Sequence, residues 1–386
     1  MLTRRRFLQS SSLFALAPTV PLFIARTARA APSADARILV VVQLDGGNDA
    51  LNTVVPHADP AYERLRPTLK HPKRDLLRLT DDVGLHPALK PLDKLLAAGH
   101  LAVIPGVGYP NPNRSHFESM AIWHTARFDP EEHKSYGWLG RALDRSAGTS
   151  YLIGSAVPMA LRGRRSTAVA LTRVEEVLLA DPQTAKRSVG PEPPDELLAF
   201  VRRQAVDGHA AADKVAGLAG GGDGGNYPGT GLAGRLKLVA RLLKADLGAR
   251  VFYTLQAGYD THANQRFAHA NLLSEFAGAV AAFFDDLAAA KLADRVALLA
   301  FSEFGRTVKE NGSAGTDHGT AGAVFLAGPG VRGGVLGTSP SLTDLAGGEP
   351  KMTTDFRRVY AATLTDWLRL PAAGLGGTFE PVKLFG

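Results

Sequence analysis

The sequence contains no cysteine among its 386 residues. This absence excludes disulfide bonds, thiolate metal ligands, a cysteine nucleophile and a lipidated N-terminal cysteine. Long apolar runs are also missing, because no segment reaches the ~20 apolar residues that a membrane-spanning helix requires. A glycine-rich run at 217–234 lacks the Gly-Lys-Ser/Thr ending of a phosphate-binding loop. We interpret this run as a flexible surface loop.

The net positive charge of the chain is concentrated at its N-terminus. The formal charge is +7, but residues 1–30 contain five arginines and no acidic residue. Subtracting these five from the 44 basic residues leaves 39 basic against 37 acidic residues, a net charge of +2. The remainder of the chain is therefore close to neutral, and its composition argues against binding to nucleic acid.

Residues 1–30 have the pattern of an export signal. Three consecutive arginines precede Phe-Leu, a short apolar stretch and an Ala-Arg-Ala cleavage site. This order predicts a twin-arginine signal peptide, the twin-arginine translocase as a partner during export, and a mature protein in the periplasm or outside the cell. The alternative, a stable membrane anchor, is disfavoured because the apolar stretch is short and contains Pro18 and Pro21.

Residues 37–386 are predicted to form a single α/β domain. Apolar runs of strand length occur at 37–44, 100–106, 249–255, 295–300 and 322–328. Segments with helical spacing of apolar residues occur at 86–99, 194–205, 232–247 and 267–290. The repeated order of strand, loop and helix predicts a three-layer α/β/α fold with a mainly parallel central sheet.

Polar side chains with possible chemical roles follow the predicted strands. They are Asp45, Ser115, Asp260, His262, Glu303, Arg306, Asp317 and His318. Because the carboxyl ends of parallel strands meet at one edge of a sheet, these side chains are expected to lie close together. Carboxylate oxygens combined with imidazole nitrogens suit Zn²⁺, Mn²⁺, Mg²⁺ or Ca²⁺. The pattern therefore predicts a divalent metal site.

Plainer structural roles are open to several of these residues. Asp45 precedes two glycines, which is typical of a turn. Ser115 and Glu118 match the S-x-x-E capping box of a helix N-terminus, although such a terminus also stabilises an anion. The polar residues between 303 and 318 are also typical of solvated charges where a strand leaves a sheet.

Five motifs give the chain a resemblance to a known family. They are LDGGNDALNTVVP at 44–56, NRSHFESMAIWHT at 113–125, GYDTHANQ at 258–265, SEFGRT at 302–307 and TDHGTAG at 316–322. Together with the N-terminal signal they resemble the exported family known as domain of unknown function 1501, over about residues 37–335. That family is similar in fold to the alkaline phosphatase and sulfatase superfamily. The resemblance implies an alkaline-phosphatase-like α/β/α domain with a metal-centred site.

The resemblance also implies roles for single residues. The implied ligands of one or two divalent ions are Asp45, Asp260, His262, Glu303 and His318. Ser115 stands at the position of the superfamily's nucleophile. Glu303 and Phe304 stand where the superfamily has an Asp-His pair, so one imidazole ligand is missing.

These observations predict a periplasmic, metal-dependent hydrolase of phosphate or sulfate esters, acting on a small molecule or a glycan. In this hypothesis Ser115 is the nucleophile, Arg306 clamps the substrate or its oxyanion, and His116 is an acid or base. The alternative is a catalytically silent binding or accessory protein that keeps the fold. Phe304 favours this alternative, because it replaces an implied metal ligand.

Overall fold

The computed structural model describes residues 36–134, 136–146, 149–164, 166, 168–172 and 225–386. The predicted signal peptide at 1–30 and the predicted helix at 194–205 lie outside the described residues. So does the glycine-rich run as far as residue 224. Its last residues, from Gly231 onwards, begin a helix, so the loop ends earlier than predicted. In the described ranges, no helix is long and apolar enough to cross a membrane.

Nine strands form the central sheet within the described part of the chain. Their spatial order is β11-β5-β10-β9-β1-β8-β6-β7, with β14 paired to β5. β10 is antiparallel to both of its neighbours, and the other pairs are parallel. The predicted mainly parallel sheet is therefore confirmed. The bounds are β1 (Ile38–Asp45), β5 (Leu101–Gly108), β6 (Thr149–Ile153), β7 (Ala168–Leu171), β8 (Ala249–Ala257), β9 (Val296–Phe301), β10 (Gly322–Ala327), β11 (Gly334–Val335) and β14 (Thr354–Asp355).

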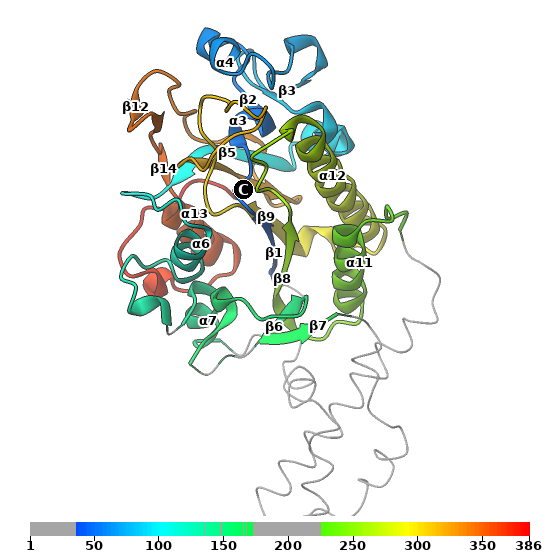
Figure 1. Cartoon of the computed structure of the whole chain (residues 1–386). Helices are drawn as coiled ribbons and strands as arrows, with labels where there is room; N and C mark the ends of the chain where they lie inside the picture. The colour runs from blue at the N-terminus through cyan, green and yellow to red at the C-terminus, as the bar shows by residue number, and fades with distance from the viewer. Residues whose placement is uncertain (1–35, 135, 147–148, 165, 167, 173–224) are drawn as a thin grey trace, which may run out of the picture.

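Helices cover both faces of this sheet (Figure 1). Side chains alternate along a strand, so Val40 and Val42 of β1 belong to one core cluster while Leu39 and Val41 belong to the other. The first cluster includes residues of α5 (Asp93–Ala97), α11 (Gly231–Lys244) and α12 (Gln265–Ala289). The second includes residues of α6 (His116–Thr125), α7 (Trp138–Leu143) and α13 (Phe356–Ala362). The predicted three layers are confirmed.

The helix expected over 86–99 is divided. It starts as the 3-10 helix η3 (Pro87–Leu92) and continues as α5. Pro91 lies inside η3, and a proline has no N–H to donate to a helical hydrogen bond. The other short turns are η2 (Lys73–Asp75), η4 (Glu132–Lys134), η5 (Met159–Leu161), η6 (Ala293–Arg295), η8 (Ala372–Leu375) and the π-helix η7 (Thr363–Trp367).

A smaller unit lies at one end of the sheet, where Figure 1 shows α3, α4, β2 and β3. Its sheet has the order β2-β4-β3. The buried Arg66 joins this unit to the loop after β9, because its Nε donates to the carbonyl of Val308 (2.9 Å) and its Nη2 to that of Thr307 (2.7 Å). Arg66 also pairs with the buried Asp49. The bounds are α3 (Ala50–Thr53), β2 (Val54–Val55), α4 (Pro60–Leu65), β3 (Leu77–Arg78) and β4 (Gly84–Leu85).

The strand directions bring four loops to one edge of the large sheet. β9, β1 and β8 are neighbours and parallel, so the segments that follow them lie side by side. β5 runs in the same direction as β9, because each is antiparallel to β10. The loop after β9 is also the segment before β10, because β10 runs antiparallel and starts at this edge. The predicted gathering of polar loops at one sheet edge follows from this arrangement.

Candidate metal centre

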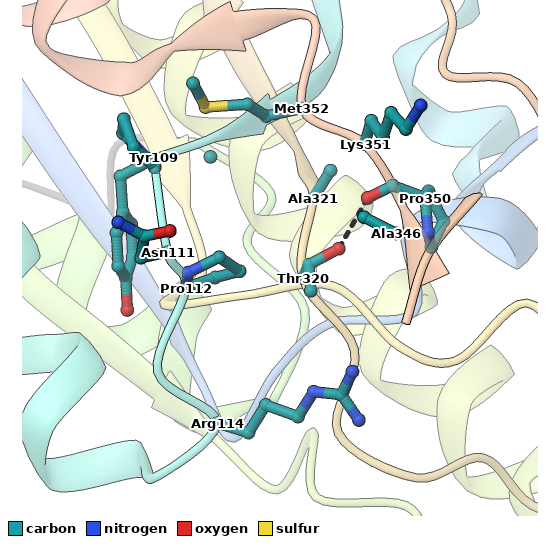
Figure 2. Close-up of a pocket in the computed structure, with 12 residues that line it drawn as sticks. Tyr109, Asn111, Pro112, Arg114, Thr320, Ala321, Ala346, Pro350, Lys351 and Met352 are labelled. Atoms are coloured by element: carbon teal, nitrogen blue, oxygen red, sulfur yellow. Dashed lines mark hydrogen bonds between the residues drawn. The ribbon is translucent and has the colours of Figure 1, made fainter. Parts of the chain in front are cut away.

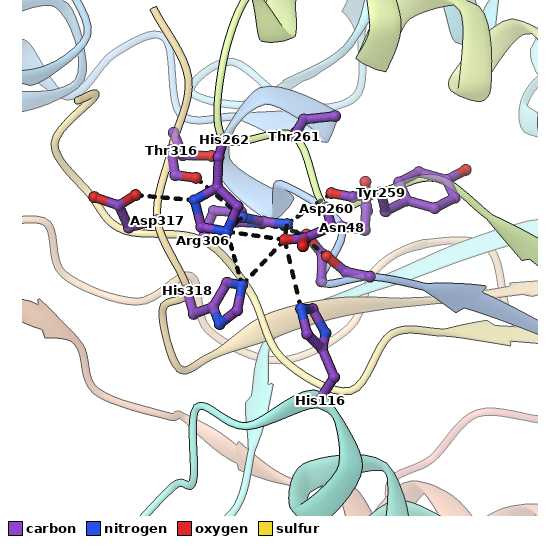
Figure 3. Close-up of polar contacts among 12 residues, drawn as sticks. Asn48, His116, Tyr259, Asp260, Thr261, His262, Arg306, Thr316, Asp317 and His318 are labelled. Atoms are coloured by element: carbon purple, nitrogen blue, oxygen red, sulfur yellow. Dashed lines mark hydrogen bonds and ion pairs between the residues drawn. The ribbon is translucent and has the colours of Figure 1, made fainter. Parts of the chain in front are cut away.

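The carboxylate of Asp260 lies among three imidazoles (Figure 3). Its Oδ1 is 3.0 Å from Nε2 of His262, 3.0 Å from Nε2 of His318 and 3.4 Å from Nε2 of His116. The Nε2 atoms of His262 and His318 are 2.9 Å apart. Ligand atoms of His116, Asp260 and His318 all lie within 4.8 Å of one another. Three side chains, those of His116, Asp260 and His318, thus direct donor atoms at one small volume, and His262 lies beside them.

The other ring nitrogen of each imidazole faces a hydrogen-bond acceptor. The Nδ1 pairs are His116 with Glu303 Oε1 (2.7 Å), His262 with Asp317 Oδ1 (3.0 Å) and His318 with the backbone oxygen of Arg114 (2.8 Å). A neutral imidazole that donates from Nδ1 carries a lone pair on Nε2. A ring in this tautomer can offer its Nε2 to a cation, and without a cation the Nε2 of His318 can instead donate to Asp260 Oδ1 in the other tautomer.

The fit to a divalent cation rests on the donors themselves. His116 Nε2 is buried and has no hydrogen-bond partner among the described residues, although an unsatisfied buried polar atom is unfavourable. Tetrahedral Zn²⁺ takes imidazole and carboxylate donors at ~2.0–2.2 Å, which places them roughly 3.3 Å from each other. Carboxylates or carbonyls bound to the second ring nitrogen are the usual supports of metal-ligating histidines. The residues fit an ion such as Zn²⁺.

The surroundings of Asp260 favour its ionised form. Burial alone raises the pKa of the Asp260 carboxyl, but hydrogen bonds from Arg306 and His318 outweigh burial and lower that pKa to about 2. Asp260 is therefore ionised at neutral pH. The hydrogen bond between His116 and Glu303 raises the pKa of His116. The hydrogen bond between Asp317 and His262 lowers the pKa of Asp317.

Glu303 and Asp45 do not belong to the group of close donor atoms. Glu303 is buried, and its Oε1 accepts from the backbone N–H of Gly46 (3.0 Å) as well as facing His116. The Asp45 carboxylate accepts from Gln43 Nε2 (3.0 Å). The geometry thus places His116 beside Asp260 and His318, while Glu303 faces the other nitrogen of the His116 ring and Asp45 contacts Gln43. Ligand roles for Glu303 and Asp45, and an acid or base role for His116, stay predictions.

Replacing Glu303 with glutamine is expected to lower divalent-ion affinity about 10- to 100-fold, the usual effect of losing a support of a ligating histidine. A neutral amide cannot hold the His116 ring as a carboxylate does. Competition with a coloured chelator measures the affinity. Glu380→Gln is the control, because Glu380 is largely exposed. Equal affinity in Glu303→Gln and the parent protein would contradict the orienting role.

Arg306 is buried, and its guanidinium is fully occupied within the protein. It donates to the backbone oxygens of Gly47 (2.7 Å), Thr316 (2.9 Å), Tyr259 (2.8 Å) and Gly46 (2.5 Å), and to Asp260 Oδ1 (2.7 Å). These acceptors belong to the loops after β1 and β8 and to the segment before β10. Arg306 therefore holds three loops together, and its role as a substrate clamp stays a prediction.

Phe304 and the two glycines after Asp45 pack closely beneath the imidazoles of the centre. The Phe304 ring centroid lies 5.0 Å from those of His116 and His318. Gly47 has φ +76°, and a Cβ there would lie 2.4 Å from the Phe304 ring. Gly46 has φ +117°, and a Cβ there would lie 2.5 Å from the backbone nitrogen of Asp260. An apolar ring therefore fills the place where the resemblance implied a further imidazole.

Ser115 is the N-cap residue of α6, but its side chain does not cap the helix. The predicted capping box with Glu118 is therefore not formed. Ser115 is exposed and lies between Arg114, whose carbonyl faces His318, and His116. Its position next to the centre follows from its two sequence neighbours.

Sequence reasoning missed the place of His116 beside Asp260 and the contact of Asp317 with the His262 ring. A usable signal for His116 is its place at the first residue of a helix that follows a strand and two prolines. For Asp317 the signal is the Asp-His pair itself, in which one residue supports an imidazole from another loop and its neighbour points inward.

Glu349 is a buried acid near the centre. It lies in β13 (Glu349–Pro350), which pairs with β12 (Leu345–Ala346). Its side-chain Oε2 has no hydrogen-bond partner in the described part of the chain. Burial raises the pKa of Glu349 to about 7, although the positive charge of Arg114 acts in the opposite direction.

This raised pKa has a consequence for stability. The folded protein binds more protons than the unfolded chain between the ordinary pKa of 4.5 and about 7, so stability falls as pH rises through that range. Glu349→Gln is expected to remove a fall of roughly 2 to 3 kcal/mol. Urea unfolding of both proteins at about pH 4 and about pH 8 measures it. An equal fall in parent and variant would show that Glu349 is not the group responsible.

The fold and the clustered side chains define a mixed α/β protein with a candidate metal centre at the carboxyl edge of its sheet. The chain belongs to the family described as "Protein of unknown function (DUF1501)", whose model matches residues 36–379. This match agrees with the resemblance carried by the five motifs. No curated protein matched the sequence.

Solved structures with some likeness to this one include three proteins. The C-terminal periplasmic domain of EcEptC from Escherichia coli, in complex with Zn, is 11% identical with a TM-score of 0.40, over 77% of this chain and 74% of that one. The lipoteichoic acid synthase LtaP from Listeria monocytogenes is 9% identical with a TM-score of 0.38, over 90% and 81%. BT1596, a 2-O GAG sulfatase, is 12% identical with a TM-score of 0.33, over 78% and 65%.

Proposed function

We propose that the protein is a divalent-metal-dependent hydrolase of phosphate or sulfate esters. The observation that carries the proposal is the convergence of three imidazole Nε2 atoms on the ionised Asp260. Such a set has the composition of a catalytic metal site built from nitrogen and oxygen donors. When bound, the ion would neutralise negative charge on the ester oxygens and lower the pKa of a hydroxyl beside it.

The residues around the ion would hold the reacting groups. Ser115 is the proposed nucleophile: it is exposed, precedes His116, and lies at the N-terminus of a helix of ten residues. Free N–H groups and the helix dipole at such an end favour a phosphate or sulfate group. Arg306 and Glu303 act by fixing the loops and the His116 ring. Phe304 excludes water from the floor of the site.

Metal analysis followed by an ester panel tests the proposal. We expect about one divalent ion per purified mature chain, and hydrolysis of aryl phosphates or sulfates that a chelator abolishes and Zn²⁺ or Mn²⁺ restores. Ser115→Ala is expected to lower turnover at least about 100-fold, with Ser146→Ala, a serine just beyond the end of α7 and outside the centre, as the control. Unchanged turnover in Ser115→Ala would reject the nucleophile. Absence of both metal and turnover would reject the enzyme.

A metal-binding protein without catalysis is the second candidate. Phe304 favours it, because an apolar ring stands where the resemblance implied another ligand. Stoichiometric ion binding with no turnover on phosphate and sulfate monoesters and diesters would select this candidate. In either case we propose export through the twin-arginine translocase to the periplasm or the medium, since residues 1–30 carry the corresponding signal pattern.

A further inference from the structure

A pocket of about 480 Å³ opens beside the metal centre. Figure 2 shows its walls: the segment from Tyr109 to Arg114 on one side, Thr320 and Ala321 at the back, and residues of the β12–β13 hairpin on the other side. The hydroxyl of Thr320 donates to the carbonyl of Pro350 (2.6 Å), which ties the back wall to the hairpin. A volume of this size is typical of small-molecule sites.

Two walls of the pocket adjoin residues of the centre. The backbone oxygen of Arg114 faces Nδ1 of His318 at 2.8 Å. Thr320 follows His318 by two residues. Ser115 follows Arg114 directly in the chain, so the proposed nucleophile is adjacent to a residue that lines the pocket.

The charge of the pocket is positive. Its twelve lining residues include Arg114 and Lys351 and no acid. Lys351 is already paired with Asp344. Among the described residues Arg114 forms no ion pair, and in Figure 2 its guanidinium extends beneath Thr320. The buried acid Glu349 interacts electrostatically with Arg114, and burial raises the pKa of Glu349 to about 7. Below about pH 7 the Glu349 carboxyl is therefore mainly protonated and does not neutralise the charge of Arg114.

The remaining walls are mainly apolar. Pro112, Ala321, Ala346 and Met352 offer carbon surface, and Asn111 contributes one amide. A compact ring carrying a negative group matches such a lining, because the ring contacts the apolar walls while the charge reaches the guanidinium. A carboxylate can accept two parallel hydrogen bonds from an arginine.

We propose that this pocket binds the leaving group of the substrate, and that Arg114 selects esters whose leaving group carries a carboxylate, as in a hydroxy acid or an acidic sugar. This proposal rests on the proposed hydrolase function, because only a hydrolase would cleave the bound ester. The pocket itself is a binding site for a carboxylate-bearing alcohol, whether or not the ester is cleaved. Arg114 contacts the centre through its backbone, and its side chain lines the pocket. The side chain would therefore determine which leaving group binds, without taking part in the reaction.

Direct binding tests the pocket without any turnover. 4-Hydroxybenzoate and phenol are titrated into the mature protein, both chelator-treated and Zn²⁺-loaded, and followed by calorimetry. 4-Hydroxybenzoate is expected to bind about tenfold more tightly than phenol to both forms, and Arg114→Gln is expected to abolish this difference while Arg114→Lys keeps part of it. Arg74→Gln, at an arginine whose side chain is 85% exposed, is the control and retains the difference.

Kinetics provides the second arm. The kcat/KM ratio of 4-carboxyphenyl phosphate to phenyl phosphate is expected to fall about tenfold in Arg114→Gln, through KM. Equal binding of 4-hydroxybenzoate and phenol, or a difference that survives Arg114→Gln, would overturn the proposal. Hydrolysis without carboxylate preference would reject the pocket and keep the hydrolase. Carboxylate binding without hydrolysis of any ester would reject the hydrolase and keep the pocket.

Discussion

Replacing Asp260 with asparagine is expected to weaken divalent-ion binding by more than about 100-fold, since loss of a mere support of a ligand already costs about 10- to 100-fold. Asp260 supplies the oxygen that all three imidazoles approach. An amide keeps the shape of the side chain but not its charge. The three histidine nitrogens would then lack the one negative group that faces them directly.

Two measurements follow the ion in this variant. Chelator competition gives the affinity, and thermal unfolding with and without Zn²⁺ gives the stabilisation, which for the parent protein is expected to reach about 2.7 kcal/mol at a free ion concentration 100 times Kd. Asp285→Asn is the matched control, because Asp285 is an exposed acid paired with Lys94. If Asp260→Asn binds Zn²⁺ as the parent does, the centre described above does not hold the ion.

Replacing Arg306 with methionine is expected to destabilise the protein by about 3 to 5 kcal/mol, the range found when one partner of a buried charged network is removed. Methionine fills part of the volume but donates no hydrogen bonds. Carbonyl groups of Gly46, Gly47, Tyr259 and Thr316 would be left without this donor. Each unsatisfied buried acceptor costs about 1 to 3 kcal/mol unless water reaches it.

Urea unfolding in the presence of chelator isolates this effect from the contribution of the ion. Arg78→Met is the control: Arg78 is 80% exposed and pairs with an exposed aspartate, so its loss is expected to cost less than about 1 kcal/mol. Arg306→Lys is expected to fall between the two, because one ammonium replaces only part of the fork. A change below about 1 kcal/mol in Arg306→Met would reject the role of Arg306 in holding the loops.

The sequence was sufficient for the sheet and its layers. Apolar runs such as 37–44 and 295–300 identified central strands, because strands buried on both faces lack polar alternation. The same property hides strand direction. β10 is buried on both faces, and its sequence has the same apolar pattern as the strands that pair in parallel elsewhere in the sheet. Its antiparallel pairing with β9 and β5 could therefore not be recognised. Proline inside 86–99 was visible, but its effect on helix type depends on the local hydrogen bonds.

The sequence predicted which residues come together at the site better than it predicted what each side chain does there. Asp260, His262 and His318 follow from motif position and strand order. Glu303 and Asp317 are carboxylates in the same loops, yet both support an imidazole Nδ1. Which carboxylate faces the ion and which faces a ring depends on side-chain direction, and spacing does not determine it. The burial of Arg306 could not be predicted for a related reason, since it depends on how the surrounding loops fold over the guanidinium.

The antiparallel insertion of β10 has a consequence for the order of assembly. Strand β10 lies between β9 and β5, so His318, just before it, reaches its place only when both neighbours are in position. The donors come from positions 116 to 318 of the chain, and contacts between residues so distant in sequence form late and slowly. A half-assembled chain has no complete set of donors. Ion capture would therefore mark the completion of the sheet, and the centre would serve as a built-in reporter of the finished fold.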